Sequence, residues 1–363
     1  WSSASEWVDN AIPPIGANVK VRNTLTLDQN VDISNLTIDA GANLNVSDAK
    51  QLTVNGALTN NGTLNLLSSV DGTATILTNG TVSGSGTNNV QQWLTVARQW
   101  WYLSSPLTAA KTTTFTGTNK IGDYNEATTS YSAPLATDLP LTAGKGYVVK
   151  LTDATDGAYT FTGGTLNNGD ITLTPTRTGI TAPKRGFNLV GNPYPSYLDW
   201  AAAYTDATNP AVNMRNAIWY RTYAGGAMTF HTYGDGDAVP ETTSPLIAPM
   251  QGFWVKVAAD NTNGSLTFKN THRKHFETGA NPLKVKALDA RPRLRLVVSN
   301  GTATDEMLVV GKSYASDVLD SYDIEKMSND NVAIPEVYSV VSNQELVINS
   351  MNALTEGKTV TLG

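Results

Sequence analysis

The amino-acid sequence predicts an all-β protein with three parts: a short N-terminal parallel β-helix (a β-solenoid), a jelly-roll-like β-sandwich, and a second, truncated β-sandwich. The composition supports this prediction, because Thr, Asn, Gly, Ala and Val are abundant and only 15% of the 363 residues are charged. Such a mixture favours strands and tight turns over helices. Strand-like segments are short and separated by Asn/Gly turns, and no long Ala/Glu/Lys/Leu stretch predicts a helical domain.

Residues 1–97 form the predicted β-helix. Short triplets alternate apolar, polar, apolar, so each presents two side chains inward and one outward. Strands in ordinary hairpins have about 5–6 residues, so these triplets are too short for hairpins. They fit a β-helix, in which each coil buries its apolar side chains against the next coil. The alternative is a small β-sandwich. The side chains predicted to point inward are Leu36, Ile38, Leu44, Val46, Leu52, Val54, Leu58, Leu64 and Leu66.

Three further segments complete the predicted organisation. Residues 98–270 contain strand-like runs rich in β-branched and aromatic residues, and they form the predicted first β-sandwich. The one helix-like stretch lies near residues 198–204. Residues 271–292 are basic, and we expect them to be a solvated linker. Residues 293–363 alternate again and form the predicted second, incomplete β-sandwich module.

Charge and composition exclude several classes of function. The formal net charge is −6, which argues against nucleic acid as a partner. Cysteine is absent and there are three histidines, so neither a disulfide-stapled scaffold nor a thiolate metal site is expected. No run of about 18 apolar residues predicts a membrane span. The first residues lack the pattern of a signal peptide, and we expect the chain to be a piece of a longer protein.

Aromatic residues on both sides of a Gly-rich loop are the candidates for ligand binding. They lie beside two aspartates, and sugar-binding modules stack pyranose rings on exposed aromatic side chains next to such groups. The alternative is that the larger rings form the core of a hairpin and the tyrosines line its rim. The predicted ligand-binding residues are Trp219, Tyr220, Tyr223, Tyr233, Asp235 and Asp237.

A second Gly-rich segment, residues 233–237, is the candidate metal site. Asp235 and Asp237 flank a glycine and Glu241 follows them, and carboxylates on a Gly-rich loop can gather calcium through oxygen ligands. The spacing lacks the full pattern of an EF-hand loop, so a polar turn is the alternative. No organic cofactor is expected.

No motif predicts catalysis. The sequence has no nucleophile elbow, phosphate loop or dinucleotide fingerprint. Asp123, Glu126 and Asp199 are the candidates for a carboxylate pair in glycoside chemistry, but the sequence does not place two of them about 5–10 Å apart. His272 and His275 lie on a strand or loop, where this spacing does not converge on one metal ion as a helical pair does. We therefore predict that the chain is not an enzyme.

Four motifs carry a resemblance to a known family. They are GFNLVGNPYPSYLDW at residues 186–200, WWYLSSP at residues 100–106, GKGYVVK at residues 144–150 and PMQGFWVK at residues 249–256. Together they make residues 1–363 similar to a region of large secreted, surface-exposed proteins of the Bacteroidota. Those proteins are exported by the type IX secretion system, which reads a C-terminal sorting domain that lies outside these residues.

The resemblance implies a location and a role. We expect the chain to be secreted or held at the extracellular face of the outer membrane, with the type IX secretion machinery as a partner through the sorting domain. The expected role is that of a non-enzymatic adhesin, stalk or spacer, with glycans or surface polysaccharide as ligands. The alternatives are a carbohydrate-binding module with its site within residues 219–241, and an accessory region of a larger secreted hydrolase.

Overall fold

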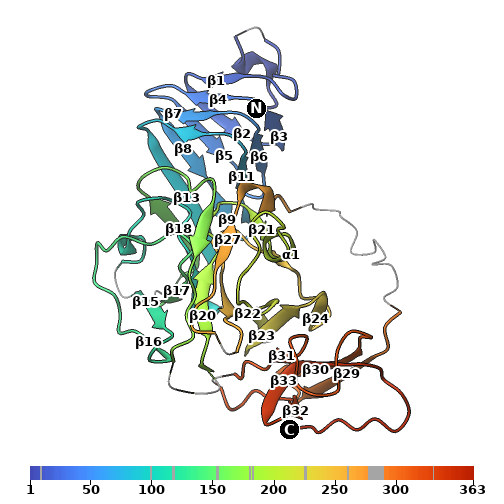
Figure 1. Cartoon of the computed structure of the whole chain (residues 1–363). Coiled ribbons are helices and arrows are strands. Elements are labelled where there is room, and N and C mark those ends of the chain that lie inside the picture. Colours follow the sequence, from blue (N-terminus) through green and yellow to red (C-terminus); the bar gives the residue numbers. More distant parts are fainter. Residues whose placement is uncertain are drawn as a thin grey trace. The chain divides into compact units, whose positions relative to one another are not determined.

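The computed structural model is nearly all β, with 44% of the chain in strands and 5% in helices (Figure 1). This confirms the predicted fold class. The structure describes every residue except 9, 99, 117–118, 153–154, 180, 182–183, 225–226, 260, 277–289 and 330.

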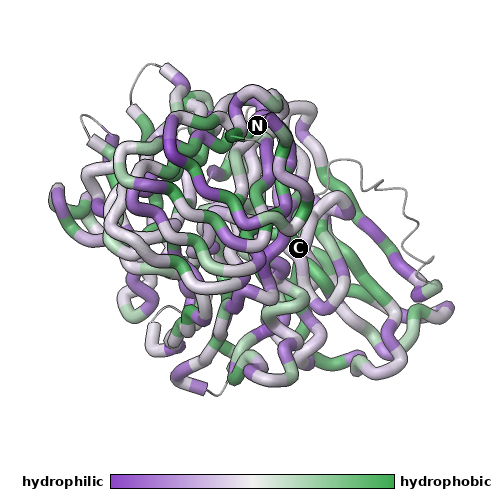
Figure 2. Tube along the Cα trace, turned by 90° about the horizontal axis from the view of Figure 1, so that it is seen from above, coloured by the Kyte–Doolittle hydropathy of each residue, from purple (hydrophilic) through white to green (hydrophobic). Residues whose placement is uncertain are grey.

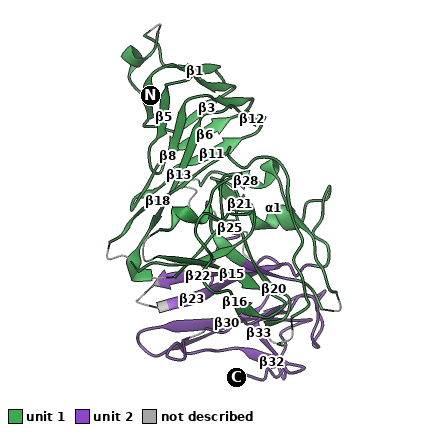
Figure 3. Ribbon diagram, turned by 90° about the vertical axis from the view of Figure 1, so that its left-hand side faces the viewer, with its two compact units in different colours: residues 1–213, 246–253, 257–276 green, residues 214–245, 254–256, 277–363 purple. Residues whose placement is uncertain are grey.

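The chain divides into two compact units, each of which is described by itself (Figure 3). Unit 1 comprises residues 1–213, 246–253 and 257–276, and unit 2 comprises residues 214–245, 254–256 and 277–363. This division does not test the domain boundaries that the sequence suggests, which stay predictions.

Unit 1 begins with a β-solenoid of about three turns. Successive strands of the coils enter three sheets in rotation, and strands one coil apart pair in parallel. One sheet contains β1 (Val19–Val21), β4 (Leu36–Ile38), β7 (Leu58–Asn60) and β12 (Val82–Ser83). The next contains β3 (Val31–Ile33), β6 (Gln51–Val54) and β11 (Thr75–Thr78). The third contains β2 (Thr24–Leu27), β5 (Asn43–Val46), β8 (Thr63–Leu66) and β13 (Thr87–Leu94).

Aliphatic side chains fill the interior of the solenoid. All nine residues predicted to point inward are at most 1% exposed. The register stacks like on like, since Leu44 pairs with Leu64 and Leu36 with Leu58 in the neighbouring coils. Burial of this kind stabilises by about 25 cal/mol per Å² of apolar surface. The predicted β-helix is therefore confirmed, and the small β-sandwich is not what forms.

Uncharged polar residues cover the outer face of the third sheet. Asn89 donates a side-chain hydrogen bond to Asn65 (2.8 Å), and Asn65 donates one to Asn45 (2.7 Å), so the amides form a ladder that runs from coil to coil. Figure 2 shows apolar and polar residues alternating along the coils. Gly62 allows the coils to approach, because a Cβ there would lie 2.3 Å from the carbonyl oxygen of Ala42.

Antiparallel strands form most of the rest of unit 1. β13 continues the solenoid and pairs with β18 (Gly157–Thr162). A four-stranded sheet follows the order β14 (Trp100–Leu103), β17 (Tyr147–Lys150), β15 (Lys120–Asn125) and β16 (Ser130–Tyr131). The other strands are β9 (Ser68–Ser69), β10 (Gly72–Thr73), β19 (Ile171–Leu173), β20 (Phe187–Gly191), β21 (Tyr197–Asp199), β25 (Leu246–Ile247), β27 (Leu266–Phe268) and β28 (Arg273–Lys274).

Helices in unit 1 are short. The predicted helical stretch is confirmed as α1 (Trp200–Tyr204), which Asp199 caps by accepting a hydrogen bond from the backbone N–H of Ala202 (3.1 Å). An aspartate at this position satisfies one of the unpaired N–H groups at a helix start. The 3-10 helices are η1 (Ala4–Glu6), η2 (Val96–Arg98), η3 (Thr112–Thr114) and η5 (Asn270–His272).

Three of the motifs that carry the family resemblance, and residues 249–253 of the fourth, meet inside unit 1. The backbone N–H of Ser104 donates to the carbonyl oxygen of Met250 (2.8 Å), and that of Gly146 donates to the carbonyl oxygen of Leu189 (3.2 Å). Asn192 donates from its backbone N–H to the carbonyl oxygen of Gln251 (2.9 Å). Segments that are far apart in the sequence are thus joined through their main chains.

Glycine is required where these motifs cross. A Cβ on Gly146 would lie 2.5 Å from the carbonyl oxygen of Val190, and one on Gly191 would lie 2.3 Å from the Cβ of Ser104. Both contacts are too short for any other residue without a shift of the main chain. The glycines of these motifs are therefore needed for the close packing of the main chains.

Residues 271–276 correct the prediction of a solvated linker, because Arg273 is only 6% exposed. Its guanidinium donates hydrogen bonds to the carbonyl oxygen of Ile76 (2.8 Å) and to Oγ1 of Thr78 (2.9 Å) on strand β11 of the solenoid. The ring of Tyr194 lies 4.7 Å below it. A buried cation of this kind needs such partners, which the sequence alone did not reveal. The rest of the predicted linker up to residue 289 lies outside the described residues.

The two histidines of this segment face different partners. Nε2 of His272 lies 3.0 Å from a carboxylate oxygen of Asp206, whereas His275 bridges two threonine hydroxyls of the solenoid. Its Nε2 lies 3.0 Å from Oγ1 of Thr53 and its Nδ1 lies 2.7 Å from Oγ1 of Thr75. In keeping with the sequence argument, they do not converge on one point.

Unit 2 contains the strands within residues 214–245, residues 254–256 of β26, and the C-terminal module. The hairpin β22 (Ala217–Ala224) and β23 (Ala227–Gly234) pairs with β24 (Asp237–Val239), and Trp254 of β26 (Gly252–Lys256) pairs with Trp219. The C-terminal sheet contains β29 (Arg293–Ser299), β30 (Thr304–Gly311), β31 (Ile324–Glu325), β32 (Ser339–Val341) and β33 (Gln344–Met351). Met307, Val309 and Met351 form its buried cluster.

Candidate functional site

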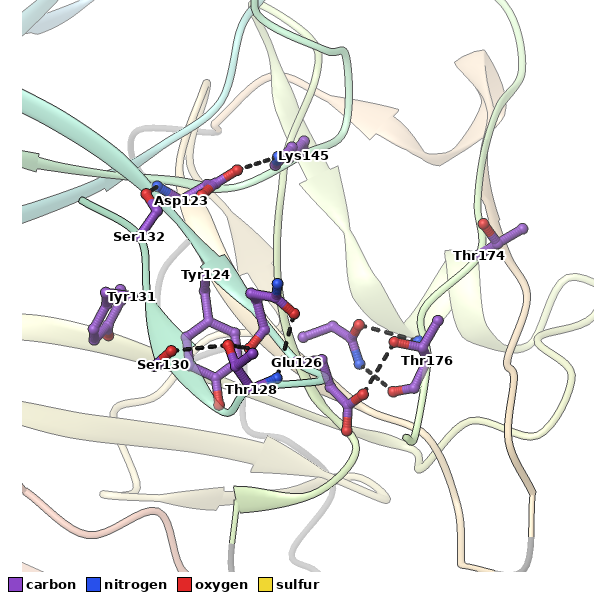
Figure 4. Close-up of a pocket in the computed structure, with 12 residues that line it drawn as sticks. Asp123, Tyr124, Glu126, Thr128, Ser130, Tyr131, Ser132, Lys145, Thr174 and Thr176 are labelled. Atoms are coloured by element: carbon purple, nitrogen blue, oxygen red, sulfur yellow. Dashed lines mark hydrogen bonds and ion pairs between the residues drawn. The ribbon is translucent and has the colours of Figure 1, made fainter. Parts of the chain in front are cut away.

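A polar pocket of about 460 Å³ lies in unit 1 beside the β15–β16 hairpin (Figure 4). Residues of the hairpin form one wall, and residues of the segment that leads into β20 form the opposite wall. The residues that line it are Asp123, Tyr124, Asn125, Glu126, Thr128, Ser130, Tyr131, Ser132, Lys145, Thr174, Thr176 and Asn188.

Local turn chemistry creates the hairpin. The side-chain oxygen of Asn125 accepts hydrogen bonds from the backbone N–H groups of Ala127 (2.9 Å) and Thr128 (3.4 Å). Thr129 has a positive φ of 51°, which reverses the chain. Asparagine favours turns because its side chain can replace a backbone acceptor in this way. The strands then pair so that Tyr124 lies opposite Tyr131.

Glu126 holds the two walls of the pocket together. Its Oε1 accepts hydrogen bonds from the backbone N–H groups of Gly179 (3.0 Å) and Gly186 (2.7 Å), and its Oε2 accepts from the N–H (2.8 Å) and Oγ1 (3.1 Å) of Thr178. Burial acts to raise the pKa of Glu126, but these backbone hydrogen bonds outweigh it and hold the pKa below its ordinary value. The carboxylate is therefore ionised, and its oxygens are occupied by hydrogen bonds that stabilise the fold.

An ion pair forms the charged part of the pocket. Lys145 Nζ donates to Asp123 Oδ2, and the side chains of Lys145 and Asp123 are 41% and 20% exposed. Burial acts to raise the pKa of Asp123, while hydrogen bonds from Lys145 and Ser132 lower it further than burial raises it. The Asp123 carboxylate is thus ionised at neutral pH, and the formal charges of the pair cancel.

Aromatic rings form the rim of the pocket. Tyr131 is 43% exposed, and its ring packs edge to face against that of Tyr124, with 5.4 Å between centroids. The hydroxyl of Tyr131 lies 2.7 Å from that of Tyr102, which fixes the direction of the ring. Burial, helped by the charge of Glu126, raises the pKa of Tyr124 to about 12, so this hydroxyl stays protonated at neutral pH.

The aromatic residues predicted to bind ligand do not share one exposed surface. Trp219 is fully buried and its Nε1 donates to the carbonyl oxygen of Glu325 (3.0 Å). Tyr220 is 9% exposed, and the pKa of its hydroxyl is raised by burial. Tyr233 is half-buried, whereas Tyr223 is 39% exposed. Trp219 and Tyr220 therefore belong to the hairpin core, as in the alternative interpretation.

The two aspartates of the candidate calcium site face cations of the chain itself. Asp237 is 1% exposed and lies within 3.1 Å of Arg291, 2.9 Å of Arg293 and 3.0 Å of Lys312. Asp235 lies 2.6 Å from the same Lys312. These cations compete with a metal ion for the carboxylate oxygens.

Glu241, the third predicted calcium ligand, is exposed. In the described parts of the chain, His, Cys, Asp and Glu residues form no group of three or more that could hold a metal ion. Calcium binding stays a prediction.

Sequence reasoning identified part of the pocket and missed the rest. Asp123 and Glu126 were named as candidate carboxylates, while Asp199, the third, caps α1 and pairs with Lys274. Lys145 lies in one of the family motifs, but nothing in the sequence pairs it with Asp123. No sequence signal distinguishes Tyr131 from the other tyrosines.

The fold and the pocket define a cysteine-free, all-β protein in which a β-solenoid leads into sheets that carry a polar pocket. The chain belongs to the family described as "Domain of unknown function (DUF8693)", whose model matches residues 1–363. No curated protein and no solved structure matches the chain. Among the helices of the described residues, none has the length and apolar character needed to cross a membrane.

Proposed function

We propose that this chain is a non-enzymatic segment of a secreted, surface-exposed protein, exported by the type IX route, and that it acts there as a stalk or adhesive spacer. The β-solenoid carries the proposal. Each coil buries aliphatic side chains against the next and adds about 4.8 Å of length, the distance between paired strands. A stack of this kind is a stiff element whose length depends on the number of coils.

The environments of the acidic residues support a non-enzymatic role. A catalytic carboxylate needs access to substrate and a pKa tuned to its task. Glu126 instead accepts several hydrogen bonds from backbone N–H groups, and Asp237 faces three cations. Asp199 caps a helix. These carboxylates are used to hold segments of the chain together.

The type IX route rests on the sequence resemblance. The motifs behind it meet through backbone hydrogen bonds in unit 1 and require glycine where they cross. Proteins that share these motifs should therefore share this packing. That supports a common architecture with the secreted proteins the chain resembles, and the proposed location rests on this resemblance.

Labelling of intact cells tests the location. Antibodies against residues 1–97 should label intact cells of the native host, or find the protein in the medium, and both signals should be lost in a strain without functional type IX machinery. A cytoplasmic marker that is labelled only after permeabilisation is the control. Protein that stays inside the cell in the unmodified strain would overturn the proposal.

Incubation of the purified chain with polysaccharides and peptides tests the non-enzymatic role. No product should form. Product release that disappears in Glu126→Gln, Asp235→Ala or Asp237→Ala would show instead that these carboxylates are catalytic.

A further inference from the structure

We propose that the pocket beside the β15–β16 hairpin binds a neutral sugar unit of a glycan. The sequence placed its carbohydrate-binding alternative within residues 219–241, where the largest rings are buried. The pocket lies elsewhere, within unit 1, and the inference does not rest on the stalk role. Its volume of about 460 Å³ falls in the range of small-ligand sites, roughly 300–1,000 Å³.

The ion pair provides complementary hydrogen-bonding groups side by side. A carboxylate accepts hydrogen bonds only, and an ammonium group has three donors, of which Asp123 uses one on Lys145. Two neighbouring hydroxyl groups of a sugar match this arrangement, since one can donate to Asp123 while the other accepts from Lys145. The partial exposure of both side chains leaves them accessible to such a ligand.

The exposed tyrosine provides an apolar surface for the ring of the sugar. Tyr131 is held between the ring of Tyr124 and the hydroxyl of Tyr102. Its orientation is therefore set before a ligand arrives, which lowers the entropy cost of binding. Aromatic side chains bury large areas while keeping a polar tip, and this suits a ligand with apolar C–H faces and polar edges.

Charge balance selects a neutral ligand. Asp123 and Lys145 cancel each other, and the oxygens of Glu126 already accept hydrogen bonds from Thr176, Thr178, Gly179 and Gly186. An acidic sugar that hydrogen-bonds to Lys145 would place its carboxylate beside that of Asp123, and the two negative charges would repel each other. A neutral sugar adds hydrogen bonds without breaking the pair.

Affinity electrophoresis and calorimetry on the full chain test the inference. The probes are neutral polysaccharides (mannan, xylan and mixed-linkage β-glucan) and acidic ones (polygalacturonate and alginate). We expect the chain to bind at least one neutral polysaccharide more tightly than either acidic one. Tyr131→Ala and Asp123→Asn should each weaken that binding about tenfold, which corresponds to a loss of about 1.4 kcal/mol.

Two matched variants serve as controls. Tyr223→Ala removes a tyrosine of similar exposure in unit 2, and Asp138→Asn breaks the exposed ion pair with Lys111 in unit 1. Neither should change binding. If Asp123→Asn disturbs folding, as judged by near-ultraviolet circular dichroism, the rim variant Tyr131→Ala decides alone.

Three outcomes would overturn the inference. They are the absence of binding to every neutral polysaccharide, preference for the acidic polysaccharides, and binding that Tyr131→Ala leaves unchanged. None of them bears on the cell-surface location, which the labelling of intact cells tests separately.

Discussion

Arg273 connects the end of unit 1 to its beginning. Beside its bonds to Ile76 and Thr78 it donates to Oγ of Ser196 (3.1 Å), so one side chain ties the solenoid to the segment that follows β20. Burial lowers its pKa to about 10, which still leaves it charged at neutral pH. Removing one partner of a buried, hydrogen-bonded charge is strongly destabilising, because the buried groups that remain no longer have a partner of opposite charge or a hydrogen bond.

His275, two residues further on, should make the stability of unit 1 depend on pH. Burial, with the positive charge of Arg273 as a lesser cause, lowers the pKa of His275 from 6.5 to about 4. The folded protein therefore binds this proton less readily than the unfolded chain does. The contribution of neutral His275 to the free energy of unfolding is at most about 3 kcal/mol. It is fully present above pH 6.5 and is lost as the pH falls towards 4.

Urea unfolding of the unmodified chain and of His275→Gln between pH 7 and 4.5 measures this effect. The variant cannot take up the proton. The difference in free energy of unfolding between the unmodified chain and the variant should therefore shrink as the pH falls. Groups that titrate in both proteins, such as His231, cancel in the comparison. Two curves that run parallel over the whole range would contradict the prediction.

At the scale of an element, the turn at residues 192–195 shows how one side chain holds a loop in place. Asn192 is fully buried, and its amide donates to the carbonyl oxygens of Ser196 (2.7 Å) and Ala248 (2.9 Å). Its side-chain oxygen accepts from the backbone N–H of Tyr194 (3.0 Å). The two prolines of the turn restrict φ and keep the backbone extended. The side-chain amide of Asn192 therefore supplies the hydrogen bonds to backbone groups that a neighbouring strand would provide in a sheet.

Asn192→Ala should lower the free energy of unfolding by about 2–4 kcal/mol, because it leaves buried backbone groups without partners. Asn23→Ala, at an exposed asparagine of the solenoid, should change it by less than about 0.5 kcal/mol. Chemical denaturation gives both values. Glycan binding by folded Asn192→Ala should equal that of the unmodified chain, and loss of binding with unchanged stability would show that the turn is a binding site.

At the scale of the whole molecule, the solenoid behaves as a stack of interchangeable coils. Asn43 pairs with Thr24 on one side and with Thr63 on the other, so these residues occupy equivalent places in successive coils. In a stack each coil contacts only its neighbours, and stability is approximately a sum of coil and interface terms.

Deletion of residues 43–62 should therefore produce a shorter solenoid that still folds. The deletion joins Ala42 to Thr63 and keeps every inward residue inward. We expect cooperative unfolding, a β-type circular dichroism spectrum and reduced stability. Deletion of residues 43–52, about half a coil, is the control and should prevent folding because the apolar side chains that follow lose their register. Equal behaviour of the two variants would refute the picture of stacked coils.

Features that depend on near neighbours can be read from the amino-acid sequence. Alternation of apolar and polar residues identified the solenoid and its inward side chains, because a strand places successive side chains on opposite faces. The position of α1 follows from local sequence as well. These features need no knowledge of what lies across the fold.

The pocket and the burial of the basic segment, in contrast, depend on contacts between distant parts of the chain. Asp123 and Lys145 meet because β15 pairs with β17, and Tyr131 reaches the rim because the hairpin turns at residue 129. Arg273 looked solvated because charge usually remains at the surface, yet carbonyl and hydroxyl groups almost 200 residues away surround it. Burial and pairing across long stretches of sequence depend on the path of the whole chain, and local composition carries little information about that path.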